Sequence, residues 1–322
     1  MTMQALPLAA ARRRSALERS LGPAVADALA RGDVVEAMIN ADGALWLDVV
    51  GEGLISTDVV LSAADREAAI RLIAHEAGEV VGEANPSLAA ILPGSLARVQ
   101  AVLPPLSAAP LIAIRKRPSR RFSLDDYVAD SIATPAQAEA LRNAVAARRN
   151  IIVAGGTGSG KTTLLNALLA ESCFRDARVV ILEDTAELQC SSLNAVLLLT
   201  RRAAPAVTMR DLVQMTLRLR PDRIVVGEVR DGAALEVLKA WNTGHPGGLL
   251  SLHANSAADA LARLEDLCVE AVGAAPRRMI AGAVDMIVFI ARTANGRRIT
   301  EISHVEGREG GLYRFARPPP DG

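Results

Sequence analysis

Residues 150–168 read NIIVAGGTGSGKTTLLNAL. This stretch fits the pattern G-x-x-x-x-G-K-[ST], in which a glycine-rich loop joins a strand to a helix. An apolar run, 150–154, precedes the loop, and a helix-favouring run, 163–168, follows it. Such a loop turns its backbone N–H groups inward, where they and the positive end of the helix bind phosphate. The sequence therefore predicts a binding site for a nucleoside triphosphate.

The residue types within this P-loop suggest a role for each part of the site. Lys161 is expected to reach the β- and γ-phosphates, and Thr162 is expected to ligate Mg²⁺. We expect ATP as the nucleotide, in contact with the whole loop and the first turn of the helix. These contacts would come from Gly155, Gly156, Thr157, Gly158, Ser159, Gly160, Lys161, Thr162 and Thr163.

Short apolar segments alternate with helical patterns around the loop. This alternation predicts an α/β domain over residues 134–314, with a mostly parallel sheet covered by helices. The expected strands are 150–154, 178–182, 195–199, 223–226 and 248–252.

A smaller α+β N-terminal domain is expected over residues 31–117. The turn pair Asp42-Gly43 separates two strand-like runs, which predicts a β-hairpin. Ser62 is a suitable N-cap for a helix that follows the hairpin. The strand candidates of this domain are 34–39, 45–50, 96–103 and 111–115.

Three further segments complete the expected organisation. Residues 1–30 are rich in Ala, Leu and Arg and predict a helical arm with a charged face. Residues 118–133 are polar and bounded by proline, as is typical of an inter-domain linker. Residues 315–322 form a Pro-rich tail that is expected to be disordered.

Composition excludes several classes of function. The chain has 36 basic and 36 acidic residues, so it lacks the overall positive field of a free-standing nucleic-acid binder. Cys173, Cys190 and Cys268 lie far apart, which argues against a zinc site or a disulfide framework and favours a reducing compartment. No apolar run reaches the ~18 residues of a spanning helix, so we expect any membrane contact to be peripheral. The N-terminal arginines follow the apolar stretch, an order that does not predict export.

Carboxylates end two of the expected strands. Glu183 begins an acidic segment, 183–187, and Glu228 follows the strand at 223–226. In open α/β folds, ligands bind at this carboxyl edge of the sheet. One carboxylate is therefore expected to activate water, and the other to hold Mg²⁺ as a Walker B residue does. Gly227 stands where many P-loop enzymes have Asp, so Glu228 would act alone or through water.

Histidines flank the expected strand at 248–252. His253 falls at its carboxyl edge, where an imidazole can sense a γ-phosphate. His245 precedes the strand, and its role stays open between function and packing. His75 and His304 are interpreted as structural or surface residues, because a lone histidine most often serves packing.

In combination, these segments resemble the traffic ATPases of the secretion superfamily. The resemblance is closest to the hexameric type IV secretion ATPases of conjugal transfer, the TrbB type, and it spans about residues 30 to 305. It rests on the P-loop at 155–162, an acidic "Asp box" at 183–187, the Gly227-Glu228 Walker B with Val229-Arg230-Asp231 after it, and a "His box" at 245–253. In that family the Walker B strand ends in Gly-Glu, so Gly227 favours the assignment.

The resemblance implies a RecA-like ATPase domain whose nucleotide is covered by the N-terminal domain. It also implies that Arg98 and Arg115, followed by Arg117, contact phosphate from the N-terminal domain. Glu183 is then the favoured base and Glu228 the residue that holds Mg²⁺ or its water, although these roles could be exchanged. The implied protein is a cytoplasmic homohexamer, peripheral at the inner membrane, that works with inner-membrane components of a conjugation or secretion machine.

Three other functions stay open at this stage. A type II secretion or pilus retraction ATPase would share the chemistry. The lack of paired cysteines disfavours the type II enzymes, which commonly carry a four-cysteine zinc insert. The retraction type is disfavoured because its characteristic Ala-Ile-Arg-Asn-Leu-Ile-Arg-Glu segment is not found after the His box. A nucleotide-gated scaffold with little hydrolysis would have little use for Glu183, Glu228 and His253 together. A DNA-pumping motor would need a basic pore, which the neutral overall charge does not favour.

Overall fold

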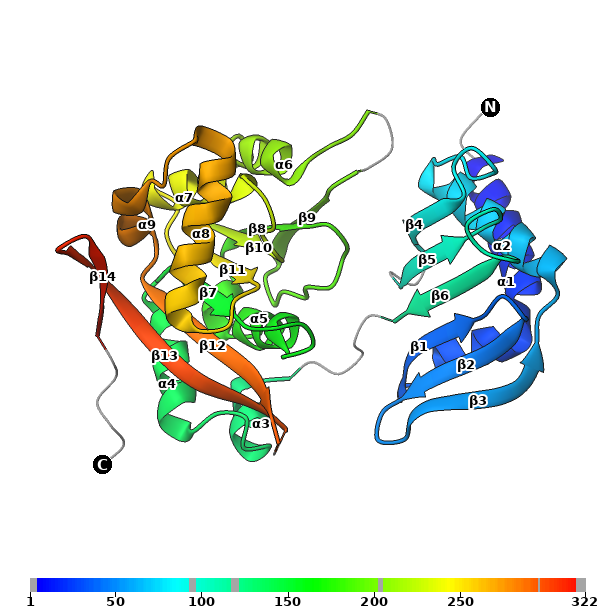
Figure 1. The fold of residues 1–322 in the computed structure, drawn as a ribbon, viewed down its shortest axis with the longest axis horizontal. Helices are drawn as coiled ribbons and strands as arrows, with labels where there is room; N and C mark the ends of the chain where they lie inside the picture. Colours follow the sequence, from blue (N-terminus) through cyan, green and yellow to red (C-terminus); the bar gives the residue numbers. More distant parts are fainter. Residues whose placement is uncertain (1–4, 93–96, 117–121, 202–204, 295, 317–322) are drawn as a thin grey trace. The chain divides into compact units, whose positions relative to one another are not determined.

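The computed structural model divides the chain into two compact units, 1–119 and 120–322 (Figure 1). Each unit has its own sheet and its own hydrophobic core. The described residues are 5–92, 97–116, 122–201, 205–294 and 296–316.

The first unit is built on a six-stranded antiparallel sheet in the order β3-β2-β1-β6-β5-β4. Alternate residues of these strands are buried, so one face of the sheet carries the core, as the period of two in a strand requires. The strands are β1 (Val34–Ile39), β2 (Ala44–Val49), β3 (Gly53–Val60), β4 (Ser87–Ile91), β5 (Arg98–Val102) and β6 (Leu111–Arg115).

Two helices complete this unit. Helix α1 (Ala5–Ala30) is kinked at Gly22, and α2 (Ala63–Ala77) packs against both α1 and the sheet. Leu17, Leu21 and Val25 of α1 are almost fully buried in the core. The segment expected to be an arm is therefore part of the packed unit, at least over its second half.

The expected hairpin and helix of this unit are confirmed. β1 and β2 pair around the turn, where Ala44 N–H donates to Asp42 Oδ1 over 2.9 Å. Ser62 caps α2 by accepting a hydrogen bond from Asp65 N–H. Strands β3 and β4 were not predicted. β3 lies at the sheet edge with alternating exposed and half-buried residues, so it has no marked apolar pattern.

The second unit contains an eight-stranded sheet in the order β14-β13-β12-β7-β11-β10-β8-β9. The six strands from β12 to β9 are parallel, and β13 and β14 add antiparallel at one edge. All five strands expected from the sequence are present, and the α/β fold class is confirmed. The strands are β7 (Ile151–Ala154), β8 (Arg178–Glu183), β9 (Asn194–Leu199), β10 (Arg223–Val226), β11 (Leu249–Leu252), β12 (Met286–Thr293), β13 (Gly296–Glu309) and β14 (Leu312–Ala316).

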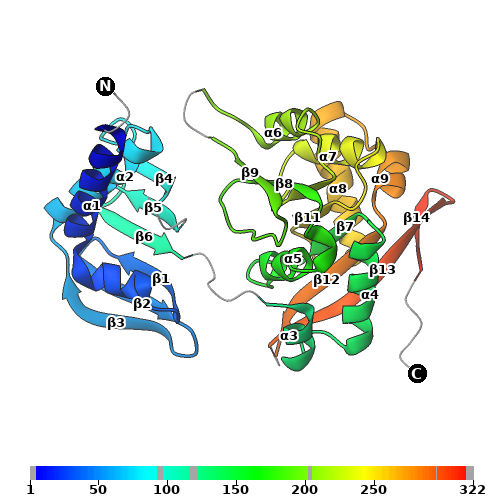
Figure 2. The same ribbon diagram turned by 180° about the vertical axis from the view of Figure 1, so that it is seen from behind.

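Helices cover both faces of this sheet. Ile152 and Ala154 of β7 point into one core, and Ile151 and Val153 point into the other. Helices α6 to α9 lie on the first side and α3 to α5 on the second, as both views of the ribbon show (Figures 1 and 2). They are α3 (Leu124–Ala129), α4 (Pro135–Ala146), α5 (Lys161–Leu169), α6 (Met209–Thr216), α7 (Ala233–Asn242), α8 (Ala257–Val272) and α9 (Arg277–Ala283), with a 3₁₀ turn at Ser172–Phe174.

Helix α3 lies within residues 118–133, the segment that the sequence predicts as a linker. Ser123 and Asp126 form a reciprocal capping box at its start. The two adjacent aspartates that made this segment look polar are first-turn residues, where carboxylates favour the helix dipole. Leu124 and Tyr127 are buried, so α3 is packed in the core of the second unit.

Strands β12 to β14 were not predicted. The apolar segment 281–291 supplies the end of α9 and most of β12, which is buried between β7 and β13. The Pro-rich tail lies outside the described residues, apart from Phe315 and Ala316 at the end of β14. Among the helices described, none combines the length and apolar character needed to cross a membrane.

Candidate active site

The P-loop runs from the end of β7 to the start of α5, as the motif predicts. Gly158 and Gly160 have positive φ angles of 71° and 104°, a region that favours glycine. Gly155 is needed for a different reason. A Cβ on it would lie 2.3 Å from the Ile290 carbonyl oxygen on β12 and 2.6 Å from Ser159 Oγ. The glycines therefore set both the curl of the loop and its close approach to the neighbouring strand.

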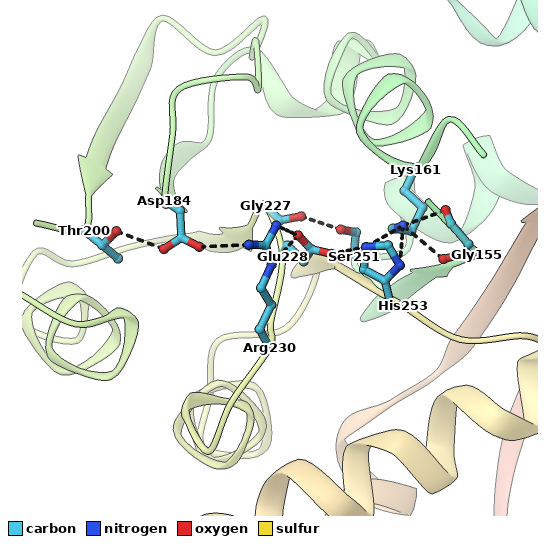
Figure 3. Close-up of polar contacts among 10 residues, drawn as sticks. Gly155, Lys161, Asp184, Thr200, Gly227, Glu228, Arg230, Ser251 and His253 are labelled. Atoms are coloured by element: carbon cyan, nitrogen blue, oxygen red, sulfur yellow. Dashed lines mark hydrogen bonds and ion pairs between the residues drawn. The ribbon is translucent and has the colours of Figure 1, made fainter. Parts of the chain in front are cut away.

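Lys161 folds back onto its own loop. Its Nζ donates to the carbonyl oxygens of Gly155 and Gly156, both over 3.0 Å, and lies 3.4–3.5 Å from the two ring nitrogens of His253 (Figure 3). The side chain is buried, and this burial lowers the pKa of the ammonium, whereas the charge of Glu228 raises it. The lysine is thus held where a phosphate group could replace the two carbonyl oxygens as its acceptor.

Glu228 and His253 meet between the ends of two parallel strands. Glu228 follows β10 and His253 follows β11, and His253 Nε2 lies 2.8 Å from Glu228 Oε1 (Figure 3). Despite this short distance, Glu228 Oε1 is buried and accepts no well-aligned hydrogen bond from any described residue. The site therefore brings Lys161, His253 and Glu228 together, and it leaves one carboxylate oxygen available to another partner.

The surroundings of His253 favour its neutral form. Partial burial lowers the pKa of this imidazole below the ordinary 6.5, and the charges of Lys161 and Arg230 lower it further, while Glu228 acts in the opposite direction. At pH 7 the contact with Glu228 is therefore between a carboxylate and a neutral ring. A neutral imidazole can exchange a hydrogen bond with bound phosphate or water.

Arg230 extends the polar contacts away from the loop. Its Nε donates to Glu228 Oε2 over 2.7 Å, with a second contact from Nη2 to the same oxygen. Arg230 Nη1 lies 4.0 Å from Asp184 Oδ2, and Asp184 in turn accepts a hydrogen bond of 2.9 Å from Thr200 (Figure 3). The second oxygen of Glu228 is thus held by a cation, which fixes the orientation of the carboxylate.

Glu183 ends β8 and turns into the protein. Its side chain is only 3% exposed, and Oε1 accepts the backbone N–H groups of Glu187 and Leu188 over 3.0 and 2.9 Å. These bonds stabilise the turn that follows the strand. The carboxylate therefore has a structural role that its position at the sheet edge did not predict.

Gly227 makes room for Glu183. A Cβ at position 227 would lie 2.9 Å from Glu183 Cγ and 3.3 Å from Glu183 Oε1. The backbone of Gly227 is itself fixed, because its N–H donates to Leu182 and its carbonyl accepts from Ser251 Oγ. A side chain at this position would therefore collide with a buried carboxylate.

Replacing Gly227 with Ala should lower the stability of the protein by about 1–3 kcal/mol, the usual cost of overpacking a filled site. The measurement is urea or thermal unfolding of the purified chain. Gly282→Ala on α9 is the matched control, because the nearest atom to its added Cβ would be Asn242 Oδ1 at 3.5 Å. Equal stability of the two variants would mean that Glu183 can move aside freely.

The two arginines expected to contact phosphate from the N-terminal domain lie in the first unit. Arg98 and Arg115 are directly opposite each other on β5 and β6, and both are exposed. Arg117 lies outside the described residues. Their position on a sheet surface of the first unit is compatible with a phosphate contact from that unit, which remains a prediction.

The other histidines have local surroundings. His245 Nδ1 lies 3.3 Å from the Ala240 carbonyl oxygen, just after α7, and His75 is an exposed residue in the last turn of α2. His304 lies on β13. Arg230 and Ser251 were not predicted as site residues. The only available signal was the Arg two residues after Glu228, which belongs to the Walker B segment.

A phosphate loop at the head of a parallel sheet, with Lys161, Glu228 and His253 in contact, defines a nucleotide-binding P-loop protein of the ATPase class. Residues 85–306 match the family described as "Type II/IV secretion system protein". The chain belongs to this family of secretion ATPases.

Relatives extend this similarity over nearly the whole chain. The "Conjugal transfer protein TrbB" of Rhizobium radiobacter is 47% identical over 300 residues, which cover 92% of this chain and 92% of that protein. The "Type IV secretion system protein PtlH" of Bordetella pertussis is 32% identical over 315 residues, covering 87% of this chain and 92% of PtlH.

Among solved structures, the pilus retraction motor PilT with bound ADP is similar with a TM-score of 0.62. The alignment covers 94% of this chain and 82% of PilT at 19% identity. This likeness concerns the fold.

Proposed function

We propose that this chain hydrolyses ATP as a homohexameric motor that powers pilus assembly and substrate transfer in a conjugation-type secretion machine. The pathway is supported by the extent of the similarity to the TrbB protein, which is named for conjugal transfer. The chemistry is supported by one contact in particular, the 2.8 Å approach of His253 to Glu228 beside Lys161. A protein that only binds nucleotide has little need for this carboxylate and imidazole.

ATP binding would use the loop as it stands. Backbone N–H groups of the loop and of the first turn of α5 would donate to the phosphates, where the helix dipole adds positive charge. Lys161 would exchange its two loop carbonyl acceptors for oxygens of the β- and γ-phosphates. Because the ammonium is already buried at this place, little reorganisation is required.

The residues also fit Mg²⁺, which in such sites neutralises charge on the β- and γ-phosphates. Thr162, the second residue of α5, would supply a hydroxyl ligand. Glu228 Oε1 fits as the acceptor of a metal-bound water, because it is buried and lacks an aligned hydrogen bond among the described residues. No cluster of three or more His, Cys, Asp or Glu lies within metal-binding range in the described part of the chain, so the protein would hold Mg²⁺ mainly through water and phosphate.

Glu228 is also the better placed residue for orienting the attacking water. Its Oε1 lies 2.8 Å from His253 Nε2, which in turn contacts Lys161, whereas the buried carboxylate of Glu183 is held in the turn after β8 by two backbone N–H groups that donate to its Oε1. The geometry thus favours Glu228 for both roles that the sequence divided between the two carboxylates. Glu228 would orient the attacking water or accept a proton from it. Glu183 would hold the turn after β8 and fill the space next to Gly227.

Arg230 and His253 would act on Glu228 from two sides. Arg230 holds Oε2 in place, and His253 would exchange its contact with Glu228 for one with the γ-phosphate. Arg98 and Arg115 are proposed to reach phosphate from the first unit, of the same or a neighbouring subunit. A guanidinium supplied in this way can raise the rate of phosphoryl transfer about 10³- to 10⁵-fold.

Binding of ATP should raise the pKa of His253, because phosphate brings negative charge next to a ring whose pKa is now lowered by burial and by Lys161 and Arg230. A group whose pKa rises on binding takes up a proton when the ligand binds. The affinity for ATP should therefore increase as the pH falls through the range around the ordinary histidine pKa. Calorimetric titrations at pH 6 in buffers of different ionisation enthalpy would measure this uptake.

The matched variant for this measurement is His253→Asn, which removes the titrating group. This variant should take up fewer protons on ATP binding than the natural protein does. The protonation of ATP itself is common to both. Identical proton uptake would show that the imidazole does not sense the phosphate.

A mating assay tests the proposed pathway. A donor strain that lacks the gene for this chain should recover conjugal transfer when supplied with the natural protein, and should not recover with Lys161→Ala. Transfer that proceeds equally with Lys161→Ala would contradict an ATP-driven role. Neighbouring genes for a conjugative pilus and mating channel would support the pathway, and pilin-retraction neighbours would overturn it.

A further inference from the structure

The end of the β12–β13 hairpin lies against the outside of the P-loop. Arg297, the second residue of β13, donates from Nε to the carbonyl oxygen of Gly158 over 3.2 Å. A Cβ on Gly160 would lie 3.1 Å from Arg297 Cδ, so the side chain follows the loop over several atoms. An arginine from a distant part of the sequence is thus placed beside the phosphate-binding backbone.

A second arginine faces the first. Arg292 of β12 and Arg297 of β13 are directly opposite each other in the antiparallel register. Ile290 and Ile299 form the pair two residues back, and both are buried in the core that contains α5. Because side chains two residues apart share a face of a sheet, Arg292 and Arg297 continue this face toward the loop.

The two guanidinium groups are not neutralised within the described structure. Like charges at directly opposite positions of an antiparallel pair are unfavourable. Both arginines are exposed, and no described carboxylate lies within 4.0 Å of either. Two positive charges therefore converge next to a loop that is built for anions, in an arrangement that an anion between them would stabilise.

We propose that Arg292 and Arg297 form a second phosphate contact, which binds the polyphosphate chain of the nucleotide from outside the P-loop. This proposal rests on the proposed nucleotide site. Lys161 binds from within the loop, and the arginine pair closes on the chain from the hairpin side. The planar guanidinium fork matches phosphate oxygens in geometry and keeps its charge at every physiological pH. The pair would position the nucleotide, so its loss would weaken binding to ATP and ADP alike.

The test is a direct binding titration with ATP and with inorganic triphosphate. Arg297→Gln and Arg292→Gln should each weaken binding of both ligands by about 3- to 10-fold, a modest effect because the arginines are exposed. Arg298→Gln is the matched control, because its side chain lies on the opposite face of the same hairpin, across from Ala291. Arg297→Lys keeps the charge without the fork and should lose less than Arg297→Gln, which separates phosphate binding from a purely structural role.

Two results would overturn the proposal. Affinities of Arg297→Gln and Arg292→Gln equal to that of Arg298→Gln would show that the pair contacts no phosphate. Weakened binding of ATP with unchanged binding of inorganic triphosphate would show that the arginines touch the base or ribose instead. Lys161→Ala in the same titration separates this failure from failure of the nucleotide site, because unchanged ATP affinity in that variant would overturn the site itself.

Discussion

Replacing Glu228 with Gln is expected to cut steady-state ATP hydrolysis by roughly 10² or more, the usual contribution of a positioned acid or base, and to leave ATP binding largely intact. Gln keeps the size of the side chain and can still accept from Arg230. It cannot take up a proton from water, and it is a poorer partner for a metal-bound water. The measurement is phosphate release at saturating ATP, with nucleotide affinity determined separately.

Glu183→Gln is the matched comparison for this variant. The amide oxygen of Gln can still accept the two backbone N–H groups of the turn, so the fold should persist. If Glu228 orients the water, Glu183→Gln should retain much more activity than Glu228→Gln. A loss of roughly 10² in Glu183→Gln alone would instead assign the base to Glu183, the residue that the sequence first favoured. Normal turnover in both variants would exclude both residues.

Replacing Lys161 with Ala should weaken ATP binding by roughly 10- to 150-fold, because a hydrogen bond to a charged group contributes about 1.5–3 kcal/mol. Among the described residues, the hydrogen-bonding contacts of Lys161 Nζ are with loop carbonyls and His253, so the loss should appear mainly in nucleotide affinity. The measurement is equilibrium binding of ATP or ADP to the purified protein.

Lys239→Ala is the control for charge alone. Lys239 lies on the surface of α7, where it pairs with Glu236 over 3.0 Å. Its removal should leave nucleotide affinity unchanged. If Lys161→Ala binds ATP as tightly as Lys239→Ala, the P-loop is not the nucleotide site.

The sequence predicted the parts of the fold that follow from local patterns. The P-loop needs a strand before it and a helix after it, and the central parallel strands are short, mostly apolar runs. Strands β3 and β9 differ in this respect although both lie at sheet edges. β9 keeps an apolar run, 195–199, whereas β3 mixes Ser, Thr and Asp with aliphatic residues.

The sequence indicated candidate residues for the site but not most of the contacts between them. The position of Glu228 and His253 at the carboxyl edge of the sheet agrees with their short contact and with the approach of His253 to Lys161. The same reasoning could not distinguish Glu228 from Glu183, because the two backbone bonds that occupy Glu183 depend on the path of the following turn. Arg297 lies 139 residues from the loop carbonyl that it contacts, so no local pattern connects them.

The most direct test of the account is the turnover of the natural protein with saturating ATP and Mg²⁺. Phosphate release should be measured with and without membrane lipid or the partner complex, beside Glu228→Gln under the same conditions. The natural protein is expected to release many phosphates per chain, and Glu228→Gln is expected to release them at least about 100-fold more slowly, with both proteins binding ATP. A natural protein that binds ATP stoichiometrically but releases no phosphate in any of these conditions would contradict the account, and it would identify a nucleotide-gated scaffold instead of a motor.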